Sequence, residues 1–283
     1  MADGPQPAGA PQPASPPQPA GPPQPAGPPQ PAGPPQPAGA PQPAGAPRPA
    51  GARHLRGVIF DMDGVVVDSE PLSLQTIAQV VTARGGAADP VFFTGLVGLS
   101  LDEALRIAAE RSGRDLDPAV LRSAYDELYL PRLRTTATPT AGLHPLIRAL
   151  SAARVPMALA SSSRLAEIQA VVAALRLGPV LAAIASGEEV ARPKPAPDVY
   201  LLAVERLGSG TAGVVAIEDS ATGVAAASAA GLRCVAVRTA LTRGHDHGGA
   251  ALTVSSLAEL DPDVLDQVAL GDPNDIGGPL MSQ

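Results

Sequence analysis

The sequence predicts an α/β protein in which a Rossmann-like parallel sheet carries helices on both faces and an all-helical cap domain is inserted. Short apolar runs at residues 57–61, 155–160, 181–185, 213–217 and 233–237 are typical of buried parallel strands. Helical patterns separate the later runs, and this alternation indicates a parallel sheet covered on both faces. The gap between the first two runs is too long for one crossover, which indicates an insertion.

Residues 1–53 are expected to form a disordered, proline-rich arm. Of the 34 prolines, 20 precede Gly51, and this stretch has two charged residues and no aromatic or β-branched residue. With so little to bury, it cannot offset the entropy of ordering. Glycine recurs every six residues, which favours polyproline II over a collagen helix. We favour an inert solubilising arm, while the PxxP spacing leaves open a weak partner with an aromatic-lined groove.

The other elements follow in chain order. We assign the core domain to residues 54–71 and 141–270, and the cap domain to residues 72–140. The cap is expected to contain three helices, at 72–84, 101–111 and 118–130. The core is expected to add helices at 143–153, 165–175, 197–207 and 223–230, and a short sixth strand at 252–254. Residues 271–283 are expected to form a flexible tail.

Composition excludes several classes of function. The net charge of −7 argues against a nucleic-acid partner, because phosphate contacts need a basic patch. The single cysteine, Cys234, excludes an intramolecular disulfide and any multi-cysteine metal site. No apolar run approaches the roughly 18 residues of a membrane span, and the N-terminus lacks the pattern of a secretory signal. We therefore expect a cytoplasmic protein without a membrane partner.

The basic residues are strongly biased. Of the 20 basic residues, 19 are arginine, and the single lysine is Lys194. A chain that uses arginine almost everywhere keeps a lysine where a compact point charge suits the site better than a planar guanidinium. Chance is the alternative explanation, but Lys194 also lies in a motif.

Two carboxylates follow the first predicted strand, in the segment Asp61-Met62-Asp63-Gly64. Ligands of open parallel sheets bind outside the carboxyl ends of the strands, where a carboxylate can be a nucleophile or a metal ligand. One intervening residue lets both acids face the same crevice while Met62 points away, and Gly64 permits a sharp turn. Alone, this pattern fits a calcium loop or a plain turn as well.

Polar residues follow three other predicted strands in the same way. They are Ser161, Ser162 and Ser163 after the second strand, Lys194 between two prolines after the third, and Glu218 and Asp219 at the end of the fourth. Prolines on both sides restrict the backbone that carries the ammonium group. Two adjacent acids at the end of an apolar run do not fit a solvated surface, but they fit the role of ligands for a hard cation such as Mg²⁺.

Together these residues predict phosphoryl transfer. Mg²⁺ and Lys194 would neutralise a phosphate, so that anionic Asp61 could attack phosphorus and form an aspartyl phosphate. Asp63 would protonate the leaving oxygen and later take a proton from water. Ser161 would donate a hydrogen bond to a phosphoryl oxygen. Phosphate-monoester hydrolysis is so slow without a catalyst that enzymes supply up to about 10²¹-fold, which a site crowded with charge would suit.

The same segments resemble the haloacid-dehalogenase superfamily of hydrolases with a helical cap, the group of β-phosphoglucomutase and of many sugar-phosphate and phosphoglycolate phosphatases. The resemblance spans residues 56–260 and rests on four motifs in order, at 60–69, 160–162, 194–198 and 217–220. It implies that Asp61 is the nucleophile and that Asp63 is the acid/base. It further implies metal ligands at Asp61, Asp63, Glu218 and Asp219, and phosphate contacts at Gly64, Ser161, Ser162 and Lys194.

Relatives within this superfamily differ in ways that the sequence can test. Haloacid dehalogenases lack the second acid, so Asp63 argues against them. Phosphonoacetaldehyde hydrolases need a lysine in the cap, but the single lysine is already assigned to the phosphate. β-Phosphoglucomutases resemble this chain more closely, yet they have a histidine where Ser73 stands and an arginine where Leu101 follows Gly98-Leu99-Ser100. A second phosphate would need that arginine.

We therefore expect a Mg²⁺-dependent phosphatase that acts on a small phosphorylated metabolite. A hexose-phosphate mutase is the alternative. A non-catalytic binding protein that acts through its proline-rich arm is a third hypothesis, and the complete catalytic set counts against it. The sequence does not name the substrate.

Several other residues have plainer interpretations. We expect His144 to be an ordinary residue at a helix start, and His245 and His247 to belong to a polar loop rather than to a metal site. Cys234 should be a buried, inert thiol. Arg132 and Arg134 lie near the return from the cap, where they could meet an anionic substrate or form a solvated surface.

Overall fold

The computed structural model describes residues 53–87, 96, 99, 101–239, 242 and 247–271. Apart from Arg53 and Gly271, the expected arm and tail lie outside the described residues. The same holds for His245 and for two of the three residues of the cap loop, Gly98 and Ser100.

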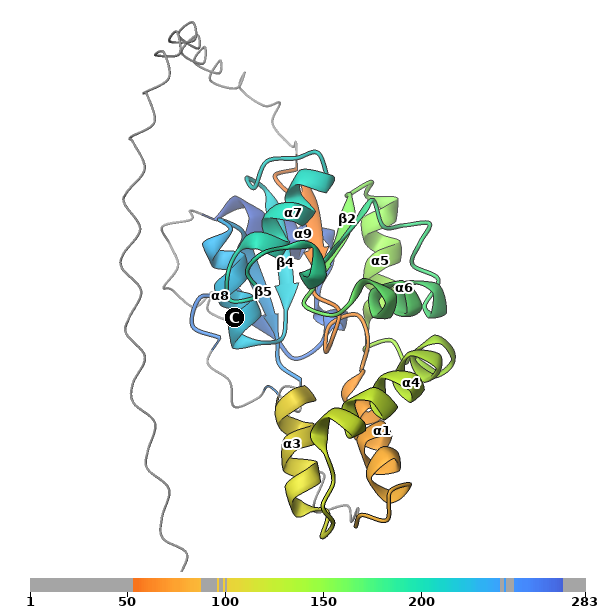
Figure 1. The fold of residues 1–283 in the computed structure, drawn as a ribbon. Coiled ribbons are helices and arrows are strands. Elements are labelled where there is room, and N and C mark those ends of the chain that lie inside the picture. The colour runs from red at the N-terminus through yellow and green to blue at the C-terminus, as the bar shows by residue number, and fades with distance from the viewer. Residues whose placement is uncertain are drawn as a thin grey trace, which may run out of the picture. The chain divides into compact units, whose positions relative to one another are not determined.

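Six parallel strands form the sheet that the sequence predicts (Figure 1). They are β1 (Gly57–Phe60), β2 (Met157–Ser161), β3 (Ala183–Ser186), β4 (Val214–Glu218), β5 (Arg233–Val237) and β6 (Leu252–Val254). Their order is β3-β2-β1-β4-β5-β6, so the chain runs outward on one side of β1 and then resumes on the other. This reversal creates a crevice beside the carboxyl end of β1, where such sheets bind ligands.

The strand register brings the predicted motifs to one level. Phe60 at the end of β1 lies opposite Leu159 of β2 and Ile217 of β4. Both neighbouring strands therefore end near the point at which Asp61 leaves the sheet. The backbone N–H of Asp61 donates to the carbonyl of Ile217 at 2.9 Å, which extends the β1–β4 pairing by one residue.

Helices cover both faces of the sheet, because alternate strand residues point in opposite directions. Ile59 packs with the apolar residues of α7 (Asp198–Arg206) and α8 (Ala221–Ala229). Val58 and Phe60 pack in the other cluster, which contains residues of α5 (Leu143–Ala152), α6 (Leu165–Ala174) and α9 (Pro262–Leu270). Two short 3₁₀ helices, η1 (Gly187–Glu189) and η2 (Leu257–Glu259), follow β3 and β6.

Between β1 and α5 the chain forms the helices α1 (Glu70–Thr82), α3 (Leu101–Arg111) and α4 (Pro118–Thr136). These helices contact one another, as the inserted helical cap requires, and α4 also contacts α6 of the core (Figure 1). Within α4, the rings of Tyr125 and Tyr129 stack with their centroids 4.8 Å apart. The predicted fold class is therefore confirmed, whereas the domain boundaries at residues 71–72 and 140–141 stay a prediction.

The predicted bounds of two helices need correction. The helix α4 was expected to end at residue 130, but it continues through Pro131 to Thr136. Leu133, just beyond the proline, is fully buried, and we attribute the continuation to this packing. The helix α1 begins at Glu70 rather than at residue 72, since Pro71 suits a first turn.

The helix α9 has no counterpart in the prediction, although its start carries a recognisable signal. The Asp261 side chain accepts hydrogen bonds from the backbone N–H groups of Asp263 and Val264, and Pro262 follows it. This is a typical helix N-cap with proline in the first turn. The remaining predicted strands and helices differ from the observed ones by one or two residues at their ends, where assignments commonly vary.

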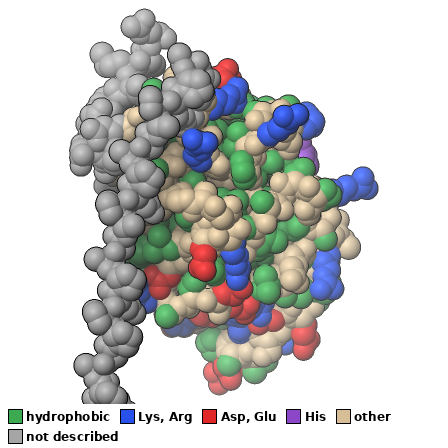
Figure 2. All heavy atoms as spheres, turned by 90° about the horizontal axis from the view of Figure 1, so that it is seen from above, with side chains coloured by type: hydrophobic (Ala, Val, Ile, Leu, Met, Phe, Trp, Pro, Cys, Tyr) green, Lys and Arg blue, Asp and Glu red, His purple; other side chains and the backbone are tan. Residues whose placement is uncertain are grey.

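No helix among the described residues is both long and apolar enough to cross a membrane. On the face that Figure 2 shows, the coloured Lys and Arg side chains are scattered rather than gathered into one field.

The conformation at Gly142 generates a stability prediction. This residue precedes α5 with a φ of +88°, and a Cβ atom there would collide with the backbone of Leu257 and Ala258. Gly208 also has a positive φ, +65°, but a Cβ atom there would meet nothing within 4 Å. We expect Gly142→Ala to lower the free energy of unfolding by about 2 kcal/mol or more, because strain and a backbone clash add.

The matched control is Gly208→Ala, which adds only the backbone strain of about 1–2 kcal/mol. Denaturant unfolding of both variants measures the difference. Equal losses would contradict a specific close approach between Gly142 and the segment at Leu257.

Candidate active site

The loop after β1 presents two carboxylates. Asp61 is 7% exposed and Met62 beside it is 1% exposed, so Met62 points into the core as the alternation of the segment predicts. Asp63 is half-buried. The loop then turns back at Gly64, whose N–H donates to the carbonyl of Val67 at 2.9 Å. The turn thus places Asp61 and Asp63 at the end of the sheet.

Gly64 also makes room for a third carboxylate. Its φ is +78°, and a Cβ atom at this position would collide with the carboxylate of Asp219. The loop after β1 and the loop after β4 can approach this closely only because residue 64 lacks a side chain. Gly64 is therefore required for the position of Asp219.

Lys194 bridges two of the acids. Its ammonium Nζ lies 2.5 Å from Oδ1 of Asp61 and 2.7 Å from Oε1 of Glu218, and its side chain is 6% exposed. The same Nζ donates to the carbonyl of Ala160 at 3.3 Å and lies 4.8 Å from the ring centroid of Tyr200. Its three N–H bonds are thus directed at three acceptors, which is the geometry that a compact ammonium allows.

Glu218 is fully buried, and both of its oxygens accept hydrogen bonds. Oε1 accepts from Lys194 and, at 3.0 Å, from the hydroxyl of Tyr200. Oε2 accepts from the backbone N–H groups of Asp219 and Ser220 and from the Ser220 hydroxyl, each at 3.0 Å. Gly223 permits this arrangement, because a Cβ atom there would collide with the Glu218 carboxylate.

Asp61, Glu218 and Asp219 form a cluster that could hold a metal ion. Each offers one carboxylate oxygen, and these oxygens lie within 4.8 Å of one another. Oxygen donors from carboxylates suit a hard cation such as Mg²⁺. The side chain of Asp63, which the resemblance also implies as a ligand residue, is not part of this cluster.

The pKa values reflect this crowding. Burial raises the pKa of Asp61 well above its ordinary value, and the charge of Glu218 adds to the shift while Lys194 opposes it. Burial, Glu218 and Asp63 raise the pKa of Asp219 to about 7. Burial would also raise the pKa of Glu218, but the charge and hydrogen bond of Lys194 lower it below its usual range.

Lys194 itself stays charged. Burial would lower its pKa, but Asp61 and Glu218 outweigh that effect and raise the pKa of Lys194 above its ordinary value. The lysine therefore supplies a permanent positive charge beside Asp61, which is the condition for an anion to approach a carboxylate.

Asp63 is held by two hydroxyl groups. Its Oδ1 accepts from Ser69 at 2.5 Å, and its Oδ2 accepts from Ser163 at 2.8 Å. The sequence interpretation assigned no role to these serines individually. Ser69 lies in the first motif, six residues after Asp63, whereas nothing in the sequence pairs Ser163 with an acid 100 positions away.

The other predicted phosphate contacts lie in the loop after β2. Ser161 is 1% exposed, and its Oγ accepts from the N–H of Ser163 at 3.0 Å, which leaves its own O–H able to donate. Ser162 is exposed. Both serines are thus on the loop that carries Ser163, and the structure brings Ser161 closer to the buried part of the site than Ser162.

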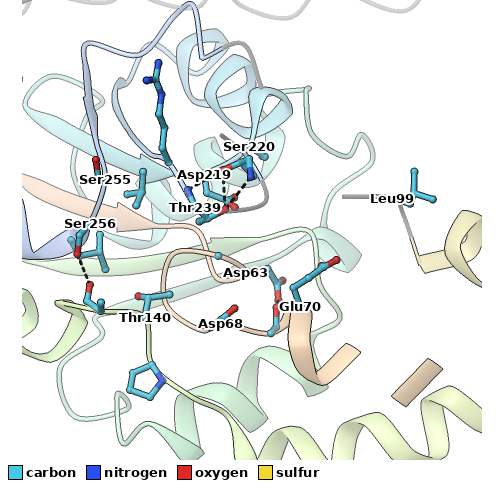
Figure 3. A pocket seen from close by; sticks show the side chains of 18 residues that line it. Asp63, Asp68, Glu70, Leu99, Thr140, Asp219, Ser220, Thr239, Ser255 and Ser256 are labelled. Atoms are coloured by element: carbon cyan, nitrogen blue, oxygen red, sulfur yellow. Dashed lines mark hydrogen bonds between the residues drawn. The ribbon is translucent and has the colours of Figure 1, made fainter. Parts of the chain in front are cut away.

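A cavity of about 430 Å³ opens beside Asp63 and Asp219 (Figure 3). Many of its lining side chains carry hydroxyl groups: Ser69, Thr140, Ser220, Thr239, Thr242, Ser255 and Ser256. Leu99 contributes to the lining from the cap loop. Of the described residues that line the cavity, Arg238 is the single cationic one, and it is exposed.

Three arginine residues near the cap and the loop after β2 are not part of the acid cluster. Arg132 lines a second cavity, of about 330 Å³, near the start of α1, and donates to the Thr76 hydroxyl at 3.1 Å. Arg134 is exposed. Arg164 pairs with Asp126 and Glu167 instead of facing the site.

Cys234, His144 and His247 lie outside the acid cluster. Cys234 is buried, and burial raises the pKa of its thiol well above the ordinary value, as an inert thiol requires. His144 lies in the first turn of α5. His247 lies in a loop after β5, as expected; it is 7% exposed, and its Nε2 lies 2.7 Å from the carbonyl oxygen of Asp219.

Comparison with known proteins identifies similar sequences and structures. A family model described as haloacid dehalogenase-like hydrolase matches residues 58–237. CbbY from Rhodobacter capsulatus is 31% identical over 214 residues, covering 72% of this chain and 94% of that protein. Fructose-1-phosphate phosphatase YqaB from Escherichia coli K12 is 32% identical over 184 residues, covering 64% of this chain and 96% of that protein.

Solved structures agree with these matches. CbbY from Rhodobacter sphaeroides is known in complex with phosphate and, as a mutant, in complex with xylulose-1,5-bisphosphate. Each structure is 27% identical to this chain with a TM-score of 0.61, and each match covers 73% of this chain and 96% of the solved one. The sequence-based resemblance to this family is confirmed.

The raised pKa of Asp219, about 7, predicts how stability depends on pH when metal is absent. An aspartate in the unfolded chain titrates near 4, so between pH 4 and 7 the folded state holds a proton that the unfolded state has lost. This extra proton therefore adds to the free energy of unfolding at low pH, and the contribution is lost as pH rises through about 7.

In a chelating buffer we therefore expect the melting temperature to fall as pH rises from about 5 to about 7, and Asp219→Asn to reduce this slope. Excess divalent cation should also reduce it in the parent, because a cation favours the ionised carboxylate. Thermal unfolding across pH measures both effects, and an unchanged slope in Asp219→Asn would contradict the assignment.

Proposed function

We propose that this chain, a phosphomonoester hydrolase that belongs to the haloacid dehalogenase-like hydrolase family, is a Mg²⁺-dependent phosphatase of small phosphorylated metabolites. The observation that carries this proposal is the buried contact of Lys194 with Asp61 and Glu218, with Asp219 beside them. A fixed cation next to a carboxylate at a strand end suits the approach of a phosphate to an anionic nucleophile.

The phosphate is proposed to bind at the ends of β1 and β2. Lys194 offers positive charge, and Ser161 offers a hydroxyl whose oxygen is already fixed by the N–H of Ser163. Gly64 and Ser162 contribute backbone groups of the two loops. The ammonium is in contact with Asp61 at 2.5 Å, so a phosphoryl oxygen that reaches Lys194 also comes close to Asp61.

The residues present also fit a bound Mg²⁺. Three carboxylates offer oxygens within 4.8 Å of one another. Burial and the neighbouring carboxylates raise the pKa values of Asp61 and Asp219, and a bound cation would oppose this shift. Asp61, Glu218 and Asp219 would hold the ion, together with the backbone carbonyl of Asp63. When bound, Mg²⁺ neutralises charge on the phosphoryl oxygens.

In the first step, a carboxylate oxygen of Asp61 attacks phosphorus and the bond between phosphorus and the leaving oxygen breaks. Asp63 supplies a proton to that leaving oxygen, so the product alcohol departs neutral. Asp61 carries an acyl phosphate at this point. Lys194 offsets the negative charge that gathers on the phosphoryl oxygens.

In the second step, water attacks the phosphorus of the acyl phosphate and Asp63 takes the proton of that water. The bond between phosphorus and the Asp61 oxygen breaks, which releases inorganic phosphate, restores the Asp61 carboxylate and returns Asp63 to its protonated form. One residue thus serves as acid and then as base, which requires that its carboxylate stay in one place between the steps.

A sugar phosphate or a similar monoester is the proposed substrate. The cavity beside Asp63 is lined by seven hydroxyl side chains, which can exchange hydrogen bonds with a polyhydroxylated molecule. CbbY is known in complex with a sugar bisphosphate, and YqaB is described as a fructose-1-phosphate phosphatase. Both relatives support the sugar-phosphate class for this chain.

Hexose-phosphate mutase activity is the less favoured alternative. At the position where a mutase would carry histidine, Ser73 accepts a hydrogen bond from the hydroxyl of Tyr125 at 2.9 Å and is tied into the packing of α1 on α4. Leu101, at the position of the distal-phosphate arginine, begins α3 and packs against the hydrophobic core. Neither residue can replace the missing groups. A purely non-catalytic binding role does not account for the buried lysine.

A screen of about one hundred phosphorylated metabolites, read by phosphate release with Mg²⁺ present, tests the proposal. We expect sugar phosphates to be hydrolysed, and we expect EDTA to stop the release and added Mg²⁺ to restore it. Asp61→Asn serves as the matched blank, since an amide cannot attack phosphorus, while circular dichroism checks that it is folded.

Full activity of a folded Asp61→Asn protein would reject the nucleophile, and unchanged rates in excess chelator would reject the metal. Conversion of one hexose phosphate into its isomer, without phosphate release, would establish the mutase alternative.

The Lys194 site generates a second prediction. We expect Lys194→Arg to lose at least about a hundredfold in kcat although the charge is kept, because a misplacement of about 1 Å can have that effect. A guanidinium is wider than an ammonium and spreads its charge over a fork, so it cannot fit between Asp61 and Glu218 at their present separation from Nζ.

Steady-state kinetics on the best substrate of the screen measures this loss. Arg206→Lys, at an exposed ion pair with Glu189, is the matched control for exchanging the two cations. A Lys194→Arg protein within threefold of the parent would mean that the single lysine reflects composition alone.

A further inference from the structure

We infer that Ser163 is a positioning residue that holds the Asp63 carboxylate in place for proton transfer. This inference rests on the proposed function, in which Asp63 protonates the leaving oxygen and later deprotonates water. It assigns a role to the third serine of the loop after β2, beyond the phosphate contacts proposed for Ser161 and Ser162.

Both oxygens of the Asp63 carboxylate accept a hydrogen bond. Ser69 donates to Oδ1 at 2.5 Å and Ser163 donates to Oδ2 at 2.8 Å. A carboxylate bound at one oxygen can still turn about its terminal torsion, which is broad for aspartate. Bound at both oxygens, it is fixed. The two contacts therefore set the direction in which Asp63 presents its oxygens.

Ser163 is itself fixed at both of its backbone groups. Its N–H donates to Oγ of Ser161 at 3.0 Å, and its carbonyl accepts from Oγ of Ser186 at 2.8 Å. Ser161 is 1% exposed and Ser186 is fully buried. A residue whose own supports are buried polar groups can hold a partner within the tolerance that catalysis needs.

The turn after β3 supports the same loop. A Cβ atom at Gly187 would lie 2.8 Å from the carbonyl oxygen of Ser162, so the two loops touch backbone to backbone. Glu188 accepts from the N–H of Leu165 at 2.9 Å and anchors the start of α6. The Ser163 hydroxyl that donates to Asp63 thus belongs to a segment that other contacts of the core hold in place.

Ser69 differs from Ser163 in its location. It lies directly before α1, where the chain enters the inserted helices, whereas Ser163 belongs to the core. Loss of the Ser163 hydroxyl would leave Asp63 attached only from the side of the helical insertion. We expect the carboxylate then to be displaced from the position that serves the leaving oxygen, while the phosphate site at Lys194 remains intact.

The chemistry offers a readout specific to this role. A sugar alkoxide is a poor leaving group and depends on the general acid, whereas p-nitrophenolate leaves readily without a proton. Damage to the position of Asp63 should therefore slow the first step for an alkyl phosphate much more than for an aryl phosphate. The second step uses Asp63 as the base for both substrates, so the comparison is made on kcat/KM, which reports the first step. Damage to the phosphate site or to the fold would slow both substrates alike.

The test compares Ser163→Ala with the parent on a sugar phosphate and on p-nitrophenyl phosphate. We expect kcat/KM to fall about tenfold or more on the sugar phosphate, in line with the cost of a displacement below about 1 Å, and to change by less than about threefold on p-nitrophenyl phosphate. Ser163→Thr, which keeps a hydroxyl, should regain most of the loss. In an Asp63→Asn background, Ser163→Ala should add no further loss.

Ser123→Ala is the control, because this exposed serine of α4 donates only to the carbonyl of Ala119 in its own helix. Equal losses of Ser163→Ala on both substrates, or no loss on the sugar phosphate, would overturn the inference. If Asp63→Asn kept its full rate on the sugar phosphate, the proposed acid/base itself would fall, and the two failures are thereby distinguished.

Discussion

The structure of the site depends on one buried cation. Lys194 touches Asp61 and Glu218 in surroundings where an isolated charge would be very costly. The carboxylates raise the pKa of the ammonium and keep it charged, and the ammonium lowers the pKa of Glu218 and keeps it ionised. Removal of Lys194 would leave two buried carboxylates without a counter-charge. Glu218 is also bound by Tyr200 and by two backbone N–H groups.

The parallel sheet supplies the convergence that this contact requires. Strands β1, β2 and β4 end at one level, so the segments after them meet without long excursions of the chain. Two glycines then permit distances that no other residue would allow, since Gly64 lies against Asp219 and Gly223 against Glu218. The sheet topology brings the loops near one another. The absence of a Cβ atom at the two glycines then permits their closest contacts.

The sequence predicted the sheet, the inserted helices and the acids Asp61, Asp63, Glu218 and Asp219, because these features depend on local periodicity and on strand ends. It could not predict the pairing of Ser163 with Asp63, since hydrogen-bond partners distant in sequence follow from tertiary distances alone. The continuation of α4 through Pro131 was missed for a related reason: local propensity ends a helix there, but the burial of Leu133 overrides it.

Charge balance links the metal to the substrate. Four carboxylates lie near a single ammonium, and burial, Glu218 and Asp63 raise the pKa of Asp219 to about 7. A phosphomonoester would bring further negative charge, so a divalent cation would favour its binding. The crowding of carboxylates favours a cation at the cluster of Asp61, Glu218 and Asp219. Phosphate and divalent cation should therefore strengthen the binding of each other, and by thermodynamic reciprocity they do so by the same factor.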